Sequence, residues 1–352
     1  MSSQGGEWMD IIVGTYDSAD NEGIHWYKVD PGSGEWSRAG GIAGIDNPSF
    51  VAVHPARSFL YAVSETEDGA VVSYRFDPEA ATLAEINRQP SRGDAPCHLS
   101  VDRSGRWLLA VNYSTGNVVL YPIGEDGSIG PLADEAAHEG AGPRPDRQEK
   151  AHAHSIFPIP GTDDWLACDL GTDGLYVYRL DAARGKLELR SETRATPGSG
   201  PRHVAFHPKL PLVYLIEELS SAVSVYRYDA ADASLEPLQS LTTLPDGFAE
   251  ENTCADIHLT ASGAYLYASN RGHDSLAVYR VGEDGLLESR GHVSTLGRTP
   301  RNFAVIGDEW VLAANQDSDS AVSFRIGEDG IPAAEGTPAR IAKPVCLMPV
   351  AR

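Results

Sequence analysis

Basic residues are scarce in this chain. Its 352 residues include 28 Lys and Arg against 50 Asp and Glu, so the formal net charge is −22, and only five of the basic residues are lysines. The acidic residues are spread along the chain rather than gathered in blocks. Nucleic acids and anionic membranes bind to basic surfaces, so we expect neither as a partner.

Long apolar runs are also lacking. No segment approaches the ~18 consecutive apolar residues of a membrane span. The first residues, "MSSQGGEWMD", show neither a basic region nor an apolar core, so we expect no signal peptide and a cytoplasmic location. The four cysteines lie far apart without a CxxC pair, which favours buried free thiols in a reducing compartment: Cys97, Cys168, Cys254 and Cys346.

Helical periodicity is absent as well, and a repeat takes its place. Six units begin near residues 48, 96, 152, 201, 255 and 300. Each contains a short apolar run, a polar turn, a second apolar run and a third run with the alternation of a half-buried strand. A weaker fourth run follows a tight turn, which reads Gly-Glu-Asp-Gly at 124–127, 282–285 and 327–330.

Four antiparallel strands in about 45 residues are typical of a propeller blade. The N-terminal segment from Ile11 supplies all but the first strand of a seventh blade, and the C-terminal "KPVCLMPV" from Lys343 resembles that missing strand. We therefore predict an all-β, seven-bladed propeller in which residues 1–352 form one domain. Its blades start near 11/343, 48, 96, 152, 201, 255 and 300, and the C-terminal strand closes the ring on the N-terminal blade.

This topology predicts where polar side chains meet. The first two strands of a blade are antiparallel, so the start of the first and the end of the second share one mouth of the axial channel, here called the polar mouth. Starts of first strands contribute His98, His152, His154, Arg202, His203, Asp256, His258, Arg301 and Asn302. Ends of second strands contribute Tyr16, Glu65, Asn112, Tyr113, Asp169, Glu217, Glu218, Asn270, Arg271, Asn315 and Gln316. The sequence thus predicts an anion-binding pocket at this mouth.

Several of these residues have ordinary structural explanations. His98 and His258 alternate with apolar neighbours, as channel-packing residues would. His152 and His154 have the spacing of a metal pair and would point the same way along a strand, but no carboxylate is paired with them locally. Glu217 and Glu218 would point to opposite faces, so at most one faces the channel. Arg202 and Arg271 are hard to explain by packing, because a buried guanidinium needs partners.

The motifs "HAH", "GPRH", "EEL", "ADIHLTASGAYLYASNR" and "PRNF" resemble those of the seven-bladed propeller lactonases, which include propeller-type 6-phosphogluconolactonases and are similar to carboxymuconate lactonizing enzymes. The resemblance runs from about Ile11 to Val350. It implies hydrolysis of 6-phosphogluconolactone in the pentose phosphate pathway. The implied catalytic residues are His154, Arg202, Glu218 and Arg271. The family more often has Asn where this chain has Glu217.

The chemistry of these side chains suits lactone hydrolysis. Glu218 or His154 could take a proton from water, and Arg202 or Arg271 could stabilise the oxyanion. The other arginine could bind phosphate with Arg301, His203 or Lys150. We expect further substrate contacts from the residues around them: His152, His203, Asp256, His258 and Arg301. No Gly-x-Ser-x-Gly elbow is present, so we expect direct hydrolysis without an acyl-enzyme or cofactor, with metal assistance left open.

Two alternatives remain from the sequence. One is a cycloisomerase that forms a lactone from a carboxylated diene, because the same arginines would bind its carboxylates. The other is a non-enzymatic scaffold like the WD-repeat propellers, although this chain lacks Trp-Asp at the ends of its third strands. We expect a small anionic sugar lactone as the partner, and a monomer or weak homo-oligomer.

Overall fold

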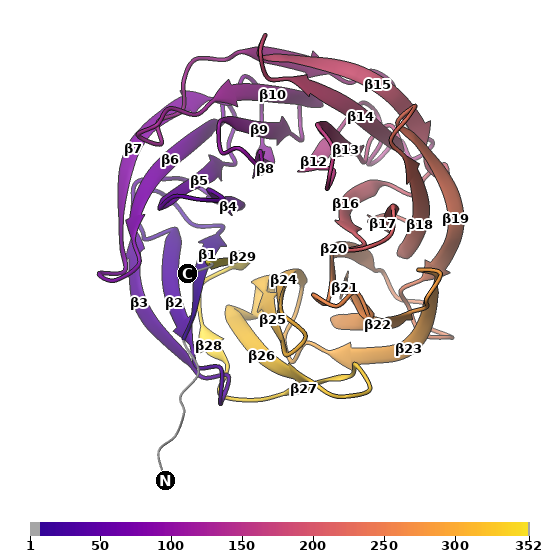
Figure 1. The fold of residues 1–352 in the computed structure, drawn as a ribbon. Helices are drawn as coiled ribbons and strands as arrows, with labels where there is room; N and C mark the ends of the chain where they lie inside the picture. Colours follow the sequence, from indigo (N-terminus) through magenta and orange to yellow (C-terminus); the bar gives the residue numbers. More distant parts are fainter. Residues whose placement is uncertain (1–7, 351–352) are drawn as a thin grey trace.

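The computed structural model describes residues 8–350, which form seven antiparallel sheets around a common axis (Figure 1). Each sheet runs outward from the axis through four strands, and the seventh carries one additional short strand. The helical structure within the described range is one 3-10 turn, η1 (Gln316–Ser318). The prediction of an all-β, seven-bladed propeller is confirmed.

The two inner strands of each blade surround the axis. The first strands are β29 (Pro344–Val350), β4 (Val51–Val53), β8 (Pro96–Val101), β12 (Ala153–Pro158), β16 (Pro201–Phe206), β20 (Thr253–Leu259) and β24 (Pro300–Ile306). The second strands are β1 (Met9–Thr15), β5 (Phe59–Ser64), β9 (Trp107–Asn112), β13 (Asp164–Asp169), β17 (Leu212–Glu217), β21 (Tyr265–Arg271) and β25 (Trp310–Asn315).

The two outer strands complete each blade. The third strands are β2 (Ile24–Val29), β6 (Ala70–Asp77), β10 (Asn117–Pro122), β14 (Gly174–Asp181), β18 (Ala222–Asp229), β22 (Ser275–Val281) and β26 (Ser320–Ile326). The fourth strands are β3 (Trp36–Ile42), β7 (Thr82–Pro90), β11 (Asp134–Ala137), β15 (Lys186–Arg194), β19 (Ser234–Thr242), β23 (Leu287–Ser294) and β27 (Pro332–Ala334), and β28 (Ala339–Arg340) also pairs with β26.

Burial follows the position of a strand within its blade. The second strand β17 is buried at every residue, whereas the outer strand β19 is largely exposed. The third strand β18 alternates at its end, where Tyr226 and Tyr228 are buried and Arg227 and Asp229 are exposed. Apolar clusters lie between neighbouring sheets, so the core is divided among the blade interfaces. A charged residue at the end of a buried second strand therefore points into the interior.

The Gly-Glu-Asp-Gly turns join third strands to outer strands, with exposed acidic residues and a buried final glycine. The carbonyls of Gly127, Gly285 and Gly330 accept hydrogen bonds from tyrosine hydroxyls on the second strand of the preceding blade, at 3.3, 2.8 and 2.8 Å. At Gly285 φ is +79°, and an added Cβ would lie 2.1 Å from Leu212. Glycine is thus required by both conformation and packing.

Two substitutions in the turn at 282–285 separate the packing role of its last glycine from the charge of its glutamate. Gly285→Ala should destabilise the fold by roughly 1–3 kcal/mol, because it combines left-handed backbone with overpacking. Glu283→Gln, two residues away and exposed, should leave both the melting temperature and the hydrolytic activity expected from the sequence unchanged. Thermal melting and initial rates of both variants provide the measurement. A large loss of turnover in Glu283→Gln would contradict the assignment of these turns to a purely structural role.

The ring closes as the sequence predicts. β29 pairs antiparallel with β1, from Asp10 opposite Val350 to Thr15 opposite Pro344, which supplies the first strand of the N-terminal blade. Val345, Cys346 and Leu347 of β29 are buried. Closure gives the N-terminal blade the same four-stranded order as the other blades, so β1 has a partner on both sides and each sheet ends at a short first strand that faces the channel. We propose that the seven blades fold as a single unit.

Deletion of the residues after Ala342 tests this closure. It would remove β29, leave the inner edge of β1 unpaired, and forfeit burial of several apolar side chains at about 1.5–3 kcal/mol each. That loss is comparable with a typical total stability of ~5–15 kcal/mol. We expect a marked drop in melting temperature or failure to fold, whereas truncation after Val350 should melt like the full chain. Unchanged melting of the first truncation would contradict the closure.

Candidate functional site

A bulge near the start of five first strands directs side chains into the polar mouth. The strand register shifts between Pro96 and His98, and equivalent shifts occur in β12, β16, β20 and β24. A bulge adds one residue to a strand and re-aims its side chain. In four of these strands the added residue lines one cavity: Cys97, His154, Arg202 and Arg301. Four of the seven blades thus each direct one side chain from a bulge into the same cavity.

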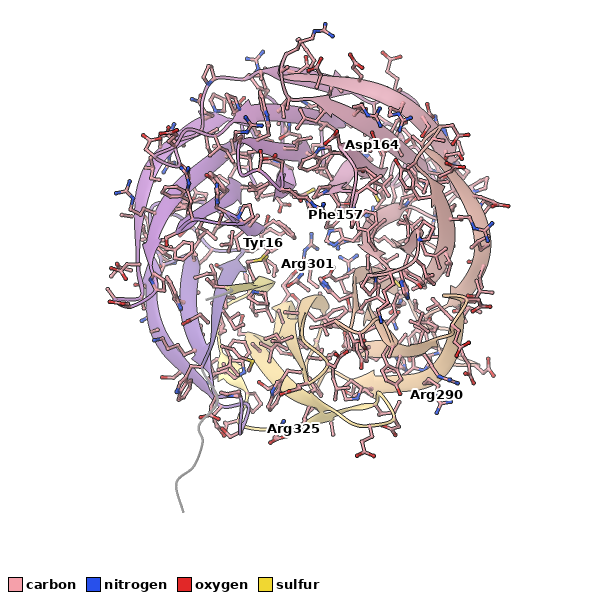
Figure 2. The ribbon with its side chains drawn as sticks, viewed as in Figure 1. Tyr16, Phe157, Asp164, Arg290, Arg301 and Arg325 are labelled. Atoms are coloured by element: carbon pink, nitrogen blue, oxygen red, sulfur yellow. The ribbon has the colours of Figure 1, made fainter. Side chains whose placement is uncertain are left out.

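This cavity combines residues from both inner strands of several blades. Figure 2 shows Tyr16 and Arg301 close to the axis of the ring. Its lining residues are Tyr16, Ser49, Phe50, Glu65, Cys97, His154, Arg202, His203, Arg301, Asn302 and Val345. The structure therefore brings the predicted residues His154, Arg202, His203 and Arg301 together in one space.

Glu218, directly after β17, is the centre of an ion-pair cluster beside this cavity. Its Oε2 lies 2.9 Å from both Arg202 Nε and Arg271 Nη2, and its Oε1 lies 2.6 Å from Arg147 Nη2. Arg202 also donates to the carbonyl of Ala255, and Arg271 donates to that of Cys254 at 2.7 Å. The side chains of Glu218 and Arg202 are almost fully buried. Three arginines thus share one carboxylate, which leaves the cluster with excess positive charge.

The arginines fix the charge of Glu218. Burial acts to raise the pKa of this carboxyl group, but Arg271 and Arg202, with smaller contributions from His154 and Arg147, hold its pKa well below the usual value. Glu218 is therefore a carboxylate at neutral pH. Protonation of Glu218 would leave its arginine partners without their counter-ion, so this carboxylate is a poor proton acceptor. Its evident role is to hold the arginines.

His154 has the opposite character. Burial, followed by the charge of Arg202, lowers the pKa of His154 well below its usual value, so the imidazole is neutral at pH 7. Its Nε2 lies 3.9 Å from Glu218 Oε2, and its Nδ1 lies 4.0 Å from Cys97 Sγ. No residue between 8 and 350 makes a hydrogen bond to Nε2. His154 can therefore accept a proton from a molecule in the cavity.

A second carboxylate, Asp256, organises the channel behind the cavity. Its Oδ1 lies 2.9 Å from His203 Nδ1, and its Oδ2 lies 2.9 Å from His258 Nε2 and 2.5 Å from Asn302 Nδ2. His203 Nε2 in turn lies 3.4 Å from Arg202 Nη1. Burial and Arg202 lower the pKa of His203 to about 4. Asp256 therefore fixes the His203 ring, and His203 in turn helps to hold the Arg202 guanidinium in position.

The sequence predicts His258 at the polar mouth, and this prediction is wrong. His258 lies near the far end of β20, contacts Phe303, and lines a separate cavity with Phe157, Leu259 and Met348. The reason is strand length, because β20 carries His258 away from the mouth where the strand begins. Asp256 raises the pKa of His258 against the effect of burial. His98 packs between Phe50 and Phe157, as its apolar neighbours indicate.

The prediction that His152 and His154 point the same way was also wrong. His152 stacks on Tyr113 with ring centroids 4.5 Å apart, and its nitrogens contact the Tyr113 carbonyl and the Glu149 carboxylate. The bulge at His154 breaks the two-residue alternation and turns that ring into the cavity instead. Among residues 8–350 no cluster of three or more His, Cys, Asp or Glu side chains has the arrangement of a metal site.

Glu217 stays apart from the cluster, as its alternation with Glu218 predicts. Its carboxylate accepts hydrogen bonds from the hydroxyls of Ser220 and Ser224, both at 2.7 Å. Burial raises the pKa of Glu217. Lys150, considered for phosphate binding, is exposed and does not line the cavity.

Arg147 is the member of the Glu218 cluster that sequence reasoning missed. It lies on the long connection between β11 and β12, outside any strand pattern, and its Nη2 also lies 3.4 Å from the Tyr113 hydroxyl. Asp169 fixes both ends of this connection, because its carboxylate contacts His138 Nδ1 at 2.7 Å and the backbone N–H of His152 at 2.9 Å. The unusual length of the connection, with its "PRPDRQEK" sequence, was the available signal.

Comparison with known proteins agrees with this architecture. A family model for the lactonases with a seven-bladed β-propeller matches residues 10–349. The chain belongs to this family. One family relative, the 6-phosphogluconolactonase of Bacillus subtilis strain 168, is 37% identical over 293 residues, which cover 83% of each chain.

Two solved structures of the same type resemble this lactonase-family chain closely. A putative 6-phosphogluconolactonase from Bacteroides fragilis has a TM-score of 0.92 at 31% identity and covers both chains completely. The periplasmic gluconolactonase PpgL of Pseudomonas aeruginosa has a TM-score of 0.92 at 32% identity, with coverage of 98% of this chain and 99% of that one. The names of these relatives differ in whether the substrate carries phosphate.

The charge cluster should respond strongly to removal of its carboxylate. Glu218→Gln should destabilise the fold by about 3 kcal/mol or more, because it leaves buried arginines without their counter-ion. Arg147→Met alone should cost little, since the Arg147 side chain is 36% exposed. In the double variant part of the Glu218→Gln loss should be recovered. Denaturant unfolding measures all three, and wild-type stability in Glu218→Gln would contradict the counter-ion role.

Proposed function

We propose that the protein is a lactonase that hydrolyses 6-phosphogluconolactone to 6-phosphogluconate. One observation carries the proposal: a neutral imidazole, His154, lines the same cavity as Arg202, which belongs to an arginine cluster with excess positive charge. Ester hydrolysis needs a base for the water and positive charge for the oxyanion, and this cavity offers both. The names of the family relatives agree with this activity.

The proposed reaction begins with a water molecule held between His154 and the lactone carbonyl carbon. The water oxygen bonds to that carbon while one of its protons passes to His154 Nε2. The carbonyl oxygen becomes an oxyanion, which Arg202 and Arg271 stabilise. Arg271 keeps a buried Nε without a hydrogen-bond partner among residues 8–350, so its pairing with Glu218 does not use all of its donors.

Ring opening completes the reaction. The tetrahedral intermediate collapses, the bond between the carbonyl carbon and the ring oxygen breaks, and that oxygen takes the proton from His154. The product is a hydroxy acid, and the enzyme returns to its starting protonation state. Glu218 keeps its charge throughout, because its arginine partners hold its pKa well below the usual value. It positions the arginines and exchanges no proton.

The four cysteines favour action in the cytoplasm. All four thiols are unpaired and buried, as expected for a protein of a reducing compartment. The described residues contain no helix that is long and apolar enough to cross a membrane. Cell fractionation of the native host measures the location, and recovery in the periplasmic fraction would contradict it.

Substitution of His154 tests the proposed base. Initial rates with 6-phosphogluconolactone, corrected for spontaneous hydrolysis, should be clearly above background in the wild type. His154→Gln should lower kcat by about 10²–10⁴-fold, the range for loss of a positioned general base. The control His25→Gln changes a histidine of β2 that lies outside the cavity and should keep wild-type turnover. Full activity in a folded His154→Gln variant would contradict the mechanism.

A further inference from the structure

Arg301 differs from the other arginines at the polar mouth. Arg147, Arg202 and Arg271 all contact Glu218. The guanidinium of Arg301 makes neither an ion pair nor a hydrogen bond with any residue in the range 8–350. It lines the cavity and lies over the ring of Tyr16, with its guanidinium carbon 5.2 Å from the ring centroid. This charge is available to a ligand.

The neighbours of Arg301 hold it in place without neutralising it. The Tyr16 hydroxyl donates to Glu65 at 3.1 Å from Oε1 and 2.9 Å from Oε2, and the Ser49 hydroxyl donates to the same carboxylate. Tyr16 is thereby fixed as a flat platform beneath the guanidinium. No ion pair within 4 Å joins Arg301 to Glu65 in the described part of the chain. Burial opposes the charge of Arg301, but Tyr16, Glu65 and Glu218 raise its pKa, so it remains cationic.

The position of Arg301 relative to His154 fits a substrate with two different ends. Arg301 is the second residue of β24 in the seventh blade, whereas His154 lies on β12 in the fourth, and these two strands lie on opposite sides of the axis (Figure 1). In a six-membered lactone with phosphate on its exocyclic carbon, several bonds separate the phosphorus from the carbonyl carbon. A substrate with its carbonyl at His154 can therefore place its phosphate near the opposite wall.

We infer that Arg301 binds the phosphate of the lactone and makes the enzyme select phosphorylated over neutral sugar lactones. The inference rests on the proposed function and divides the arginines by role. A guanidinium can donate two parallel N–H hydrogen bonds to a phosphate. Each of these charge-assisted hydrogen bonds is about twice as strong as a hydrogen bond between neutral groups. Arg202 and Arg271 act at the carbonyl, and Arg301 acts at the other end of the substrate.

Paired kinetics on two lactones test the inference. Arg301→Met should lower kcat/KM for 6-phosphogluconolactone by about 10²-fold, mainly through KM, as expected for loss of a charged hydrogen-bonding partner. With unphosphorylated glucono-1,5-lactone the change should stay within about threefold, because that substrate never contacts the site. Arg301→Lys keeps the positive charge but lacks the paired N–H donors of a guanidinium. Its kcat/KM for 6-phosphogluconolactone should therefore lie between those of the wild type and Arg301→Met. An equal loss on both lactones, or no loss on either, would overturn the inference.

The control variant removes a similar charge far from the channel. Arg290 lies on the outer strand β23, where Figure 2 shows it at the periphery, and Arg290→Met should leave both kinetic constants unchanged. A change in Arg290→Met as large as that in Arg301→Met would indicate a general effect of net charge and would also overturn the inference. Melting curves identify any variant that fails to fold, and Arg301→Lys then carries the comparison.

Calorimetry separates the inference from the proposed function. The wild type should bind 6-phosphogluconate at least about tenfold more tightly than gluconate, a difference of ~1.4 kcal/mol that Arg301→Met should abolish. If the wild type shows this preference but hydrolyses neither lactone, the proposed function fails and the phosphate site stands. If it binds both acids equally, the phosphate site fails whatever the hydrolysis rates are. Inorganic phosphate, as a competitor, should displace 6-phosphogluconate only from chains that contain Arg301.

Discussion

The ion-pair cluster around Glu218 is the interaction on which the site depends. Three guanidiniums from three parts of the chain converge on one buried carboxylate. Desolvation of a buried charge costs several kcal/mol, so Arg202 and Arg271, the two largely buried arginines of the cluster, depend on Glu218 as their counter-ion. While Glu218 is ionised, it holds Arg202 and Arg271 at the polar mouth. A single carboxylate does not neutralise both guanidiniums, so positive charge remains for a substrate. Burial, followed by the charge of Arg202, lowers the pKa of His154 and keeps the imidazole neutral, the form that accepts a proton.

The propeller makes this concentration of charge possible. Buried second strands and interfaces between blades supply a rigid ring, and the bulges of the first strands turn selected side chains toward the axis. The whole chain carries a formal charge of −22, yet four arginines gather at one mouth of the channel. A local positive region in an acidic protein attracts small anions into the pocket, because low-dielectric walls focus the field there. The acidic outer surface is unsuited to larger polyanions.

Sequence reasoning predicted the fold because the propeller repeats its pattern in every blade. Closure by the C-terminal strand followed from the repeat, topology placed Arg202, Glu218 and Arg271 at the same mouth, and the family resemblance singled these three out among the residues there. The bulges could not be predicted, since one inserted residue leaves no periodic signal, and His152 and His154 were therefore expected to face alike. Arg147 was missed because a loop side chain obeys no strand alternation. His258 was misplaced because strand length was not known to a residue.

The pH dependence of hydrolysis tests the central claim most directly: burial together with Arg202 keeps His154 neutral, and the arginine cluster keeps Glu218 ionised. The substrate should be glucono-1,5-lactone, because a phosphate monoester itself titrates near pH ~6. The lowered pKa of His154 means that the imidazole stays unprotonated as the pH falls through 6.5, its ordinary value. We expect kcat/KM, corrected for spontaneous hydrolysis, to stay level through that range and to fall only well below it. An acid limb at or above pH 6.5 would contradict the account.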